Sequence, residues 1–169
     1  RYVASKKKPM ILSTGMANEK DINNALEAVR KEGNQEVLLL HCVSSYPAPP
    51  EQYNLKTIPL MREKFNCMVG LSDHTIGNYN AIASVALGAV FIEKHFISSR
   101  KEVGPDSTFS MEPDELLDLT KSTKEVWESL GEDGLEIQES EKANIKFRRS
   151  IYVIKDIKKG DTFNHENIR

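Results

Sequence analysis

Short apolar runs alternate with helical patterns four times along residues 1–131, and this alternation constrains the fold more than any other feature of the sequence. The predicted strands lie within 8–16, 37–43, 67–71 and 89–92, and the predicted helices within 18–33, 55–65, 79–87 and 113–130. Strands that alternate with helices through short connections indicate parallel strands joined by crossovers, hence an α/β fold. Four such units form either half of an eight-stranded (β/α)8 TIM barrel or a small open sheet.

Capping residues and helix breakers mark the ends of the predicted helices. Asn18 is suited to cap the first helix, and Asp21 three residues later extends this to a capping box. Gly33 is placed to end that helix. Pro113 suits the first turn of the last helix, and Gly131 is placed to stop it.

The bulk composition excludes several classes of function. A net charge of −2 gives no reason to expect nucleic acid or an anionic membrane surface as a partner. No segment has the apolar length of a transmembrane helix, and no secretory signal opens the sequence. Cys42 and Cys67 lack the spacing of a zinc site, so free thiols in a cytoplasmic setting are expected.

The composition changes after residue 131, which indicates a domain boundary. Residues 1–131 form the predicted half barrel, the polar and charged stretch 132–149 a linker, and residues 150–169 the start of another domain. The sequence begins without methionine and ends without a closing element, so we expect it to be a fragment of a longer protein. A half barrel has open edges, and we therefore expect exposure of 37–43 and 89–92.

Two histidines, His74 and His95, each follow an apolar run that is typical of a buried strand. Side chains alternate between the faces of a strand, so Ser72 shares a face with His74, and Glu93 shares a face with His95. In a barrel of parallel strands, these strand ends form the active-site face. Two imidazoles with a carboxylate nearby can hold a divalent metal, whereas hydrogen-bonded packing is the alternative for each histidine.

Several short motifs stand in a specific order along the chain: L-S-T-G-M at 12–16, L-L-H-C-V-S-S-Y-P-A-P at 39–49, G-L-S-D-H-T at 70–75, E-K-H-F at 93–96, G-P-D at 104–106 and R-R-S-I-Y at 148–152. Together they closely resemble the sialic acid synthase family, which includes the pseudaminic, legionaminic and spore-coat relatives. The resemblance implies a (β/α)8 barrel followed by a small antifreeze-like (SAF) domain. It also implies condensation of phosphoenolpyruvate with an N-acetylmannosamine-type amino sugar, release of phosphate, and use of Mn²⁺ or Mg²⁺.

The same resemblance assigns roles to strand-end and loop residues. His74 and His95 match the metal ligands of the family. Asp106 matches a residue that helps to hold the sugar near the metal, and Tyr46 matches a tyrosine that lines the substrate pocket. Glu93 is expected to act as an acid, a base or a partner of the metal ligands.

Three serines are implied to lie near the substrates. Ser13 matches a contact to the phosphate of phosphoenolpyruvate, and Ser72 is expected in the same phosphate cluster. Ser44 stands where several members of the family have an asparagine, which leaves the identity of the sugar open.

Other readings of the sequence remain. Another metal-dependent barrel enzyme would need further ligands, and His41, which lies earlier in its strand, is expected to be packing instead. A non-catalytic relative is the third reading. The resemblance further implies a homodimer for the full-length protein, and it places a catalytic glutamate and phosphate-binding lysines in preceding strands, so residues 1–169 alone are expected to be inactive.

Overall fold

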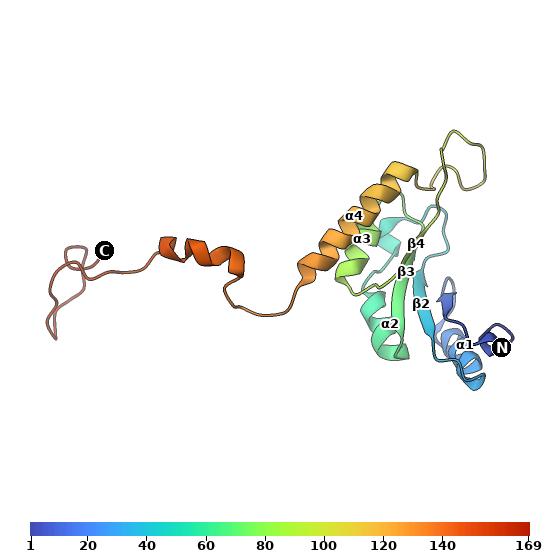
Figure 1. The fold of residues 1–169 in the computed structure, drawn as a ribbon, viewed down its shortest axis with the longest axis horizontal. Coiled ribbons are helices and arrows are strands. Elements are labelled where there is room, and N and C mark those ends of the chain that lie inside the picture. The colour runs from blue at the N-terminus through green and yellow to red at the C-terminus, as the bar shows by residue number, and fades with distance from the viewer. The chain divides into compact units, whose positions relative to one another are not determined.

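The computed structural model describes residues 1–169, which divide into two units, 1–131 and 132–169. The first unit contains a parallel sheet in the order β1-β2-β3-β4, and the predicted α/β alternation is confirmed (Figure 1). The strands are β1 (Met10–Ser13), β2 (Val37–Cys42), β3 (Met68–Asp73) and β4 (Ile92–Lys94), and the helices are α1 (Glu19–Lys31), α2 (Thr57–Phe65), α3 (Tyr79–Ala86) and α4 (Pro113–Leu130). The short 3-10 helices η1 (Ala4–Lys6) and η2 (Pro50–Gln52) complete this unit.

The helix ends follow the predicted signals. The Asn18 side chain accepts hydrogen bonds from the backbone N–H groups of Lys20 and Asp21, while its own N–H donates to the Asp21 carboxylate at 3.1 Å. This capping box begins α1, because it satisfies N–H groups that have no partner within the helix. Pro113 opens α4, and Gly131, with a φ of 52°, ends it.

The fourth strand was predicted too early in the chain. The prediction placed it at 89–92, whereas β4 spans Ile92–Lys94. Hydrophobicity identifies the apolar run, but the pairing with β3 determines where the strand begins and ends. This pairing sets Ser72 opposite Glu93. The Val90 N–H still donates to the Val69 carbonyl at 3.0 Å, so the earlier residues extend the backbone contact. Glu93 therefore lies inside the strand and not beyond its end.

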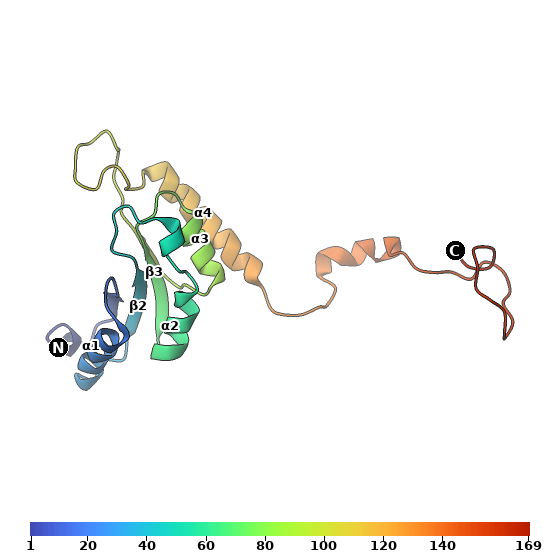
Figure 2. The same cartoon turned by 180° about the vertical axis from the view of Figure 1, so that it is seen from behind.

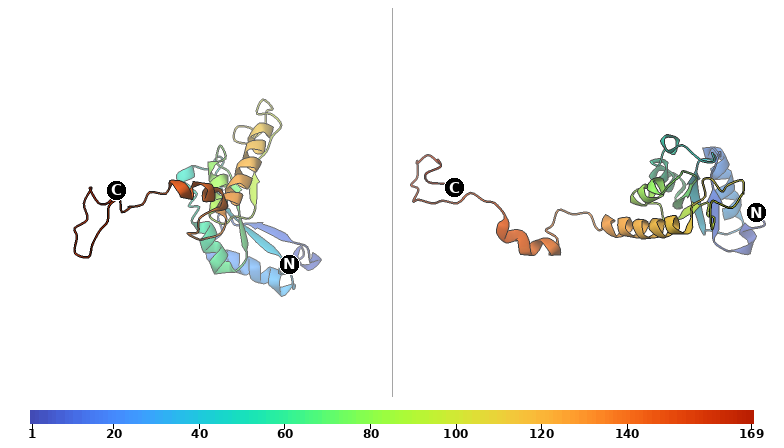
Figure 3. Two further views of the ribbon diagram at one scale, coloured as in Figure 1. Left: turned by 60° about the vertical axis from the view of Figure 1, so that its left-hand side comes forward. Right: turned by 90° about the horizontal axis from the view of Figure 1, so that it is seen from above.

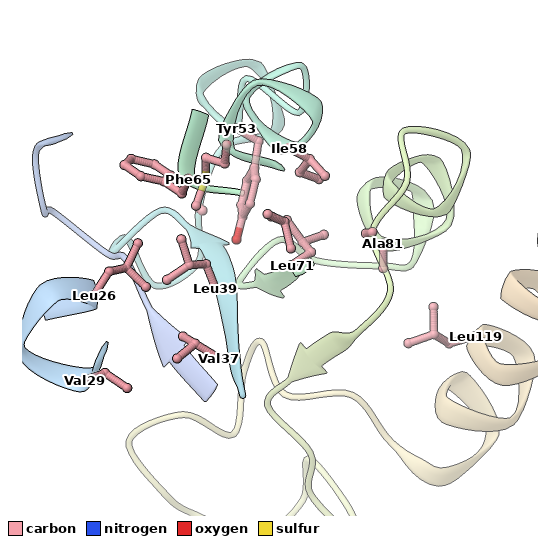
Figure 4. Packing of buried hydrophobic residues seen from close by; sticks show 14 of the residues in the cluster. Leu26, Val29, Val37, Leu39, Tyr53, Ile58, Phe65, Leu71, Ala81 and Leu119 are labelled. Carbon is pink, nitrogen blue, oxygen red and sulfur yellow. The ribbon is translucent and has the colours of Figure 1, made fainter. Parts of the chain in front are cut away.

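The helices cover one face of the sheet, which we call the outer face. Figure 4 shows Leu26 of α1 and Phe65 of α2 beside Leu39, and Ala81 of α3 and Leu119 of α4 belong to the same buried cluster. Helices α3 and α4 lie side by side (Figures 1 and 2). Leu39 and Leu71 are 2% and 0% exposed, so this layer is the hydrophobic core of the unit. None of the helices is both long and apolar enough to span a bilayer.

The opposite face of the sheet, which we call the inner face, has no helical layer. Ile11 of β1 and Phe91 before β4 are 50% and 40% exposed. Gly70 lies between them in the sheet, where an added Cβ would stand 2.5 Å from the Phe91 carbonyl oxygen. The expected exposure therefore holds for 89–92 in part, because Val90 is 60% exposed, but it is wrong for β2, a central strand with five of its six residues buried.

The second unit, 132–169, contains no buried residue. The stretch predicted as a linker includes the 3-10 helix η3 (Glu139–Phe147) (Figure 3). Beyond it, Val153 and Ile168 form an isolated antiparallel bridge, and Tyr152 exchanges two backbone hydrogen bonds with Arg169. These contacts turn the end of the chain back on itself.

Candidate active site

The structure brings His74 and His95 together at the carboxyl ends of β3 and β4. Their ring centroids are 5.3 Å apart, with an angle of 78° between the ring planes. The sheet register explains this proximity, because the residues directly before them, Asp73 and Lys94, lie opposite one another. Two adjacent parallel strands thus deliver two imidazoles to one place.

His74 is held in position by the segment that follows β2. Its Nδ1 lies 2.8 Å from the Val43 carbonyl oxygen, its backbone N–H donates to the Tyr53 hydroxyl at 3.0 Å, and its carbonyl accepts from the Ala48 N–H at 3.0 Å. A carbonyl only accepts hydrogen bonds, so Nδ1 carries the proton and the lone pair of the neutral ring lies on Nε2. The side chain therefore has one fixed tautomer and is 5% exposed.

His95 is more exposed and is oriented by a carboxylate. Its Nδ1 lies 3.3 Å from Asp106 Oδ2, and the two side chains are 32% and 53% exposed. The loop that carries Asp106 is closed at its base, because Met111 donates its N–H to the His95 carbonyl at 2.9 Å and Ile97 donates to the Met111 carbonyl at 3.0 Å. The Asp106 contact engages Nδ1 and leaves Nε2 as the available nitrogen.

Ser72 and Glu93 lie on the inner face together with the histidines. The Ser72 hydroxyl donates to Glu93 Oε1 at 2.7 Å and lies 3.4 Å from His74 Nε2. Ser72 is 2% exposed, whereas Glu93 is exposed. A polar group at this depth needs a partner, and the Glu93 carboxylate supplies it.

Aromatic rings border the two imidazoles. The Tyr46 ring centroid lies 4.3 Å from that of His74 and 5.7 Å from that of His95. Phe109 lies 5.0 Å from His95, centroid to centroid, and 5.9 Å from Tyr46. The sequence reasoning selected Tyr46 but missed Phe109, because a loop residue carries no periodic signal.

The other two predicted serines lie elsewhere. Ser13 ends β1 and is exposed, and β2 separates it from Ser72 on β3. Ser44 is also exposed, and its hydroxyl approaches Gly15, where a Cβ would stand 3.0 Å away. Neither serine forms a hydrogen bond to Ser72, Glu93 or the histidines. The three serines thus form no contiguous cluster within this chain.

Three polar side chains, those of Tyr53, Asp73 and Lys94, support the site from behind and were not selected from the sequence. The Tyr53 hydroxyl donates to the Ser72 carbonyl and accepts from the His74 N–H, and burial raises the pKa of this phenol. Lys94 forms an ion pair with Asp73 at 2.7 Å. His41, expected to be packing, lies 2.6 Å from the Tyr53 carbonyl through Nε2 and is 8% exposed.

The donors fit a divalent metal in type but form an incomplete set. Metal-bound histidines commonly engage their second nitrogen with a carbonyl or a carboxylate, which is the arrangement of His74 with Val43 and of His95 with Asp106. No group of three or more His, Cys, Asp or Glu side chains is arranged to hold a metal ion. This chain therefore offers two imidazole ligands and leaves the remaining positions to other groups.

Comparison with known proteins places this geometry in context. Residues 1–134 match the model of the NeuB family. The chain is 41% identical over 169 residues to a pseudaminic acid synthase of Campylobacter jejuni, covering 100% of this chain and 49% of the relative. It is 41% identical over 171 residues to an N,N'-diacetyllegionaminic acid synthase of the same species, covering 99% of this chain and 51% of the relative.

A solved structure shows the same architecture. The crystal structure of the N-acetylneuraminic acid synthetase of Leptospira borgpetersenii aligns with a TM-score of 0.77 and 37% identity, over 86% of this chain and 51% of that one. The chain thus spans about half the length of the relatives that it matches. By comparison with that structure, the curled parallel sheet of this chain corresponds to half of a barrel.

Proposed function

The chain belongs to the NeuB family, and on this premise we propose that the complete protein condenses phosphoenolpyruvate with an N-acetylmannosamine-type amino sugar, releasing phosphate and forming a nine-carbon α-keto acid. Relatives that are 41% identical are pseudaminic and legionaminic acid synthases, which supports the reaction class but not one sugar. The observation that carries the proposal is the convergence of His74, His95, Ser72 and Glu93 on one face of the sheet.

His74 and His95 would hold the divalent cation, Mn²⁺ or Mg²⁺, through their Nε2 atoms. When bound, such an ion supplies Lewis-acid stabilisation of negative charge on an oxygen. The protein's contribution is orientation, since Val43 and Asp106 fix the two rings. Because both rings must be neutral to bind metal, affinity is expected to fall in acid.

The reaction forms a bond between C3 of phosphoenolpyruvate and the aldehyde carbon of the sugar. Water then adds at C2, and the C2–oxygen bond to phosphate breaks. We assign to Glu93, whose carboxylate accepts from the Ser72 hydroxyl, the acceptance or donation of a proton at this step. Asp106 and Tyr46 would orient the sugar, because both lie beside the imidazoles and are more than half exposed.

The phosphate of phosphoenolpyruvate requires hydrogen-bond donors. We assign one such donor to Ser13, whereas Ser44 lies in a separate loop and the only hydroxyl proton of Ser72 is donated to Glu93, so neither is needed for this role. Ser13 is exposed at the carboxyl end of β1, so its hydroxyl is free to meet a ligand there. The resemblance sets Ser44 where several members of the family have an asparagine, so Ser44 is the first position to examine for the choice of sugar.

The test is an assay of the complete protein. We expect phosphate release from phosphoenolpyruvate that requires both an amino-sugar aldehyde and a divalent cation. Phosphate release without the sugar would indicate a hydrolase instead, and no turnover with any amino sugar would support a non-catalytic role. Comparison of N-acetylmannosamine with diacetamido sugars then identifies the substrate class.

We further expect the complete protein to be a homodimer that acts in the cytoplasm. Both cysteines are free thiols, which agrees with a reducing setting. Sedimentation of the complete protein tests the assembly, and a monomer at working concentration would contradict it.

A further inference from the structure

A buried ion pair lies directly behind the two histidines. Lys94 Nζ is 2.7 Å from Asp73 Oδ2, and the two side chains are 4% and 0% exposed. The register sets Asp73 opposite Lys94, one residue before His74 and His95 respectively. Because side chains alternate, the pair lies on the outer face while the imidazoles lie on the inner face.

Every polar atom of this pair is engaged. Lys94 also donates to the carbonyls of Thr75 and Gly77, each at 2.9 Å. The second oxygen of Asp73 accepts the Thr75 N–H at 3.0 Å and the Thr75 hydroxyl at 2.8 Å. The ammonium thus uses its three donors on three fixed oxygens, which ties β4 to the end of β3 and to the loop after it.

Stability alone is a weak explanation for such a pair. Removing two charges from water is costly, and well-packed apolar residues commonly give equal or greater stability at such positions. What the pair does determine is geometry, because Asp73 and Lys94 are covalently joined to the two imidazole-bearing residues. The Lys31–Glu27 pair at 3.4 Å is different, since its side chains are 67% and 63% exposed and both residues belong to α1.

We propose that the Asp73–Lys94 pair is a positioning device that sets the separation of His74 and His95 so that both Nε2 atoms reach one divalent cation. The inference rests on the proposed function. The pair contacts no reacting group and acts through the backbone of the two strands.

The test uses the double variant Asp73→Asn/Lys94→Met in the complete protein. Asparagine keeps an oxygen that accepts from Thr75, and methionine keeps the apolar stem without the charge. We expect a folded protein whose Mn²⁺ affinity, measured by EPR titration, falls about 10–100-fold, the usual effect of losing the support of a metal ligand. The kcat at saturating Mn²⁺ should also fall, because the imidazoles no longer share one geometry. The matched control, Lys31→Met, should leave both quantities unchanged, because it breaks an exposed pair within α1.

Wild-type Mn²⁺ affinity and kcat in the folded double variant would overturn the inference and leave the pair a structural contact. If the double variant does not fold, Asp73→Asn alone breaks the ion pair while keeping an oxygen for Thr75, and wild-type Mn²⁺ affinity in that variant would equally overturn it. Failure of the wild-type protein to bind Mn²⁺ would instead overturn the proposed metal site together with the inference.

Discussion

The outer face of the sheet holds Leu39 and Leu71 at 2% and 0% exposure beneath the helices, whereas the inner face leaves half of Ile11 and 40% of Phe91 exposed. The same strands supply both faces, because successive side chains point in opposite directions. On β3, Leu71 and Asp73 serve the outer layer, while Ser72 and the following His74 serve the inner one. The parity of a residue's position therefore decides whether its side chain packs beneath the helices, where substitution acts mainly on stability, or lies beside the imidazoles, where it acts mainly on the proposed chemistry; the Asp73–Lys94 pair is the proposed exception. Substitutions at neighbouring positions should therefore separate stability from chemistry.

The largest effect is expected from the inner face. His74→Ala or His95→Ala in the complete protein should abolish metal-dependent turnover and leave the far-ultraviolet circular dichroism unchanged, because each removes one of two imidazoles without disturbing the core. The matched control is His41→Gln, because the His41 ring lies on the outer face and contacts the Tyr53 carbonyl. This variant should lose about 1 kcal/mol of stability, the usual value of a hydrogen bond, yet keep Mn²⁺ binding. Normal turnover in both alanine variants would contradict the assignment of the metal ligands.

The outer face should respond in the opposite way. Leu39→Ala removes a side chain from the core beneath the helices. We expect a loss of about 2–5 kcal/mol in the free energy of unfolding, from lost burial and the cavity left behind, with the activity per folded molecule retained. Urea denaturation of the complete protein measures the loss. A changed KM in the folded variant would show that substitution on the outer face also alters the site on the inner face.

Substitution of Gly70 tests how closely the neighbouring strands pack around it on the inner face. A Cβ at this position would meet the Phe91 carbonyl oxygen at 2.5 Å and Leu40 Cδ2 at 2.8 Å, and one of these contacts is with backbone. Gly70→Ala should therefore destabilise the complete protein by about 1–3 kcal/mol through overpacking. The same denaturation experiment measures it. An unchanged midpoint would show that β4 shifts freely away from β3.

The smallest effect concerns the base of the loop that carries Asp106. Burial acts to raise the pKa of Glu115, but the Glu112 N–H and the Arg100 guanidinium outweigh it and hold the pKa of this carboxyl below its ordinary value. A lowered pKa in the folded protein means that stability from Glu115 is present above the unfolded pKa and is lost as the pH falls through the folded one. At pH 7 the free energy of unfolding of the wild type should exceed that of Glu115→Gln by only about a few tenths of a kcal/mol. The difference is small because the Glu115 side chain is 39% exposed and solvent screens its ion pair.

The pH dependence of that difference is the measurement. Thermal unfolding of both proteins between pH 7 and pH 3 should show the advantage of the wild type disappearing below about pH 4.5, where glutamate protonates. A difference that stays constant over this range would mean that the Arg100 contact contributes nothing through the charge of Glu115.

The strand–helix order was predictable from the sequence because each element carries its own periodicity and capping residues, as Asn18 and Pro113 show. The limits of β4 were not, because the apolar run 89–92 fits a strand equally well, and only the register with β3 places the strand at Ile92–Lys94. The hydrophobicity of a segment indicates that it is buried, but the limits of a strand depend on the neighbouring strand with which it pairs. That neighbour cannot be read from the local sequence.

The candidate site divides in the same way. Alternation along a strand was enough to expect Ser72 beside His74 and Glu93 beside His95, since that rule is local. Tyr53 and Phe109 reach the site from loops whose course depends on tertiary contacts, so no local pattern pointed to them. The separation of Ser13 from Ser72 likewise depends on the order of strands and not on either strand alone.

The segment that follows β2 has a consequence for protein engineering. Three of its residues, Val43, Ala48 and Tyr53, hold His74 by its ring, its carbonyl and its N–H, while Ser44 and Tyr46 remain exposed. A graft of this whole loop from a relative with another sugar would exchange the support of the imidazole along with the pocket lining. If the proposed function holds, redesign of the sugar specificity should therefore use single substitutions at the exposed positions Ser44 and Tyr46 and leave the backbone of the loop unchanged.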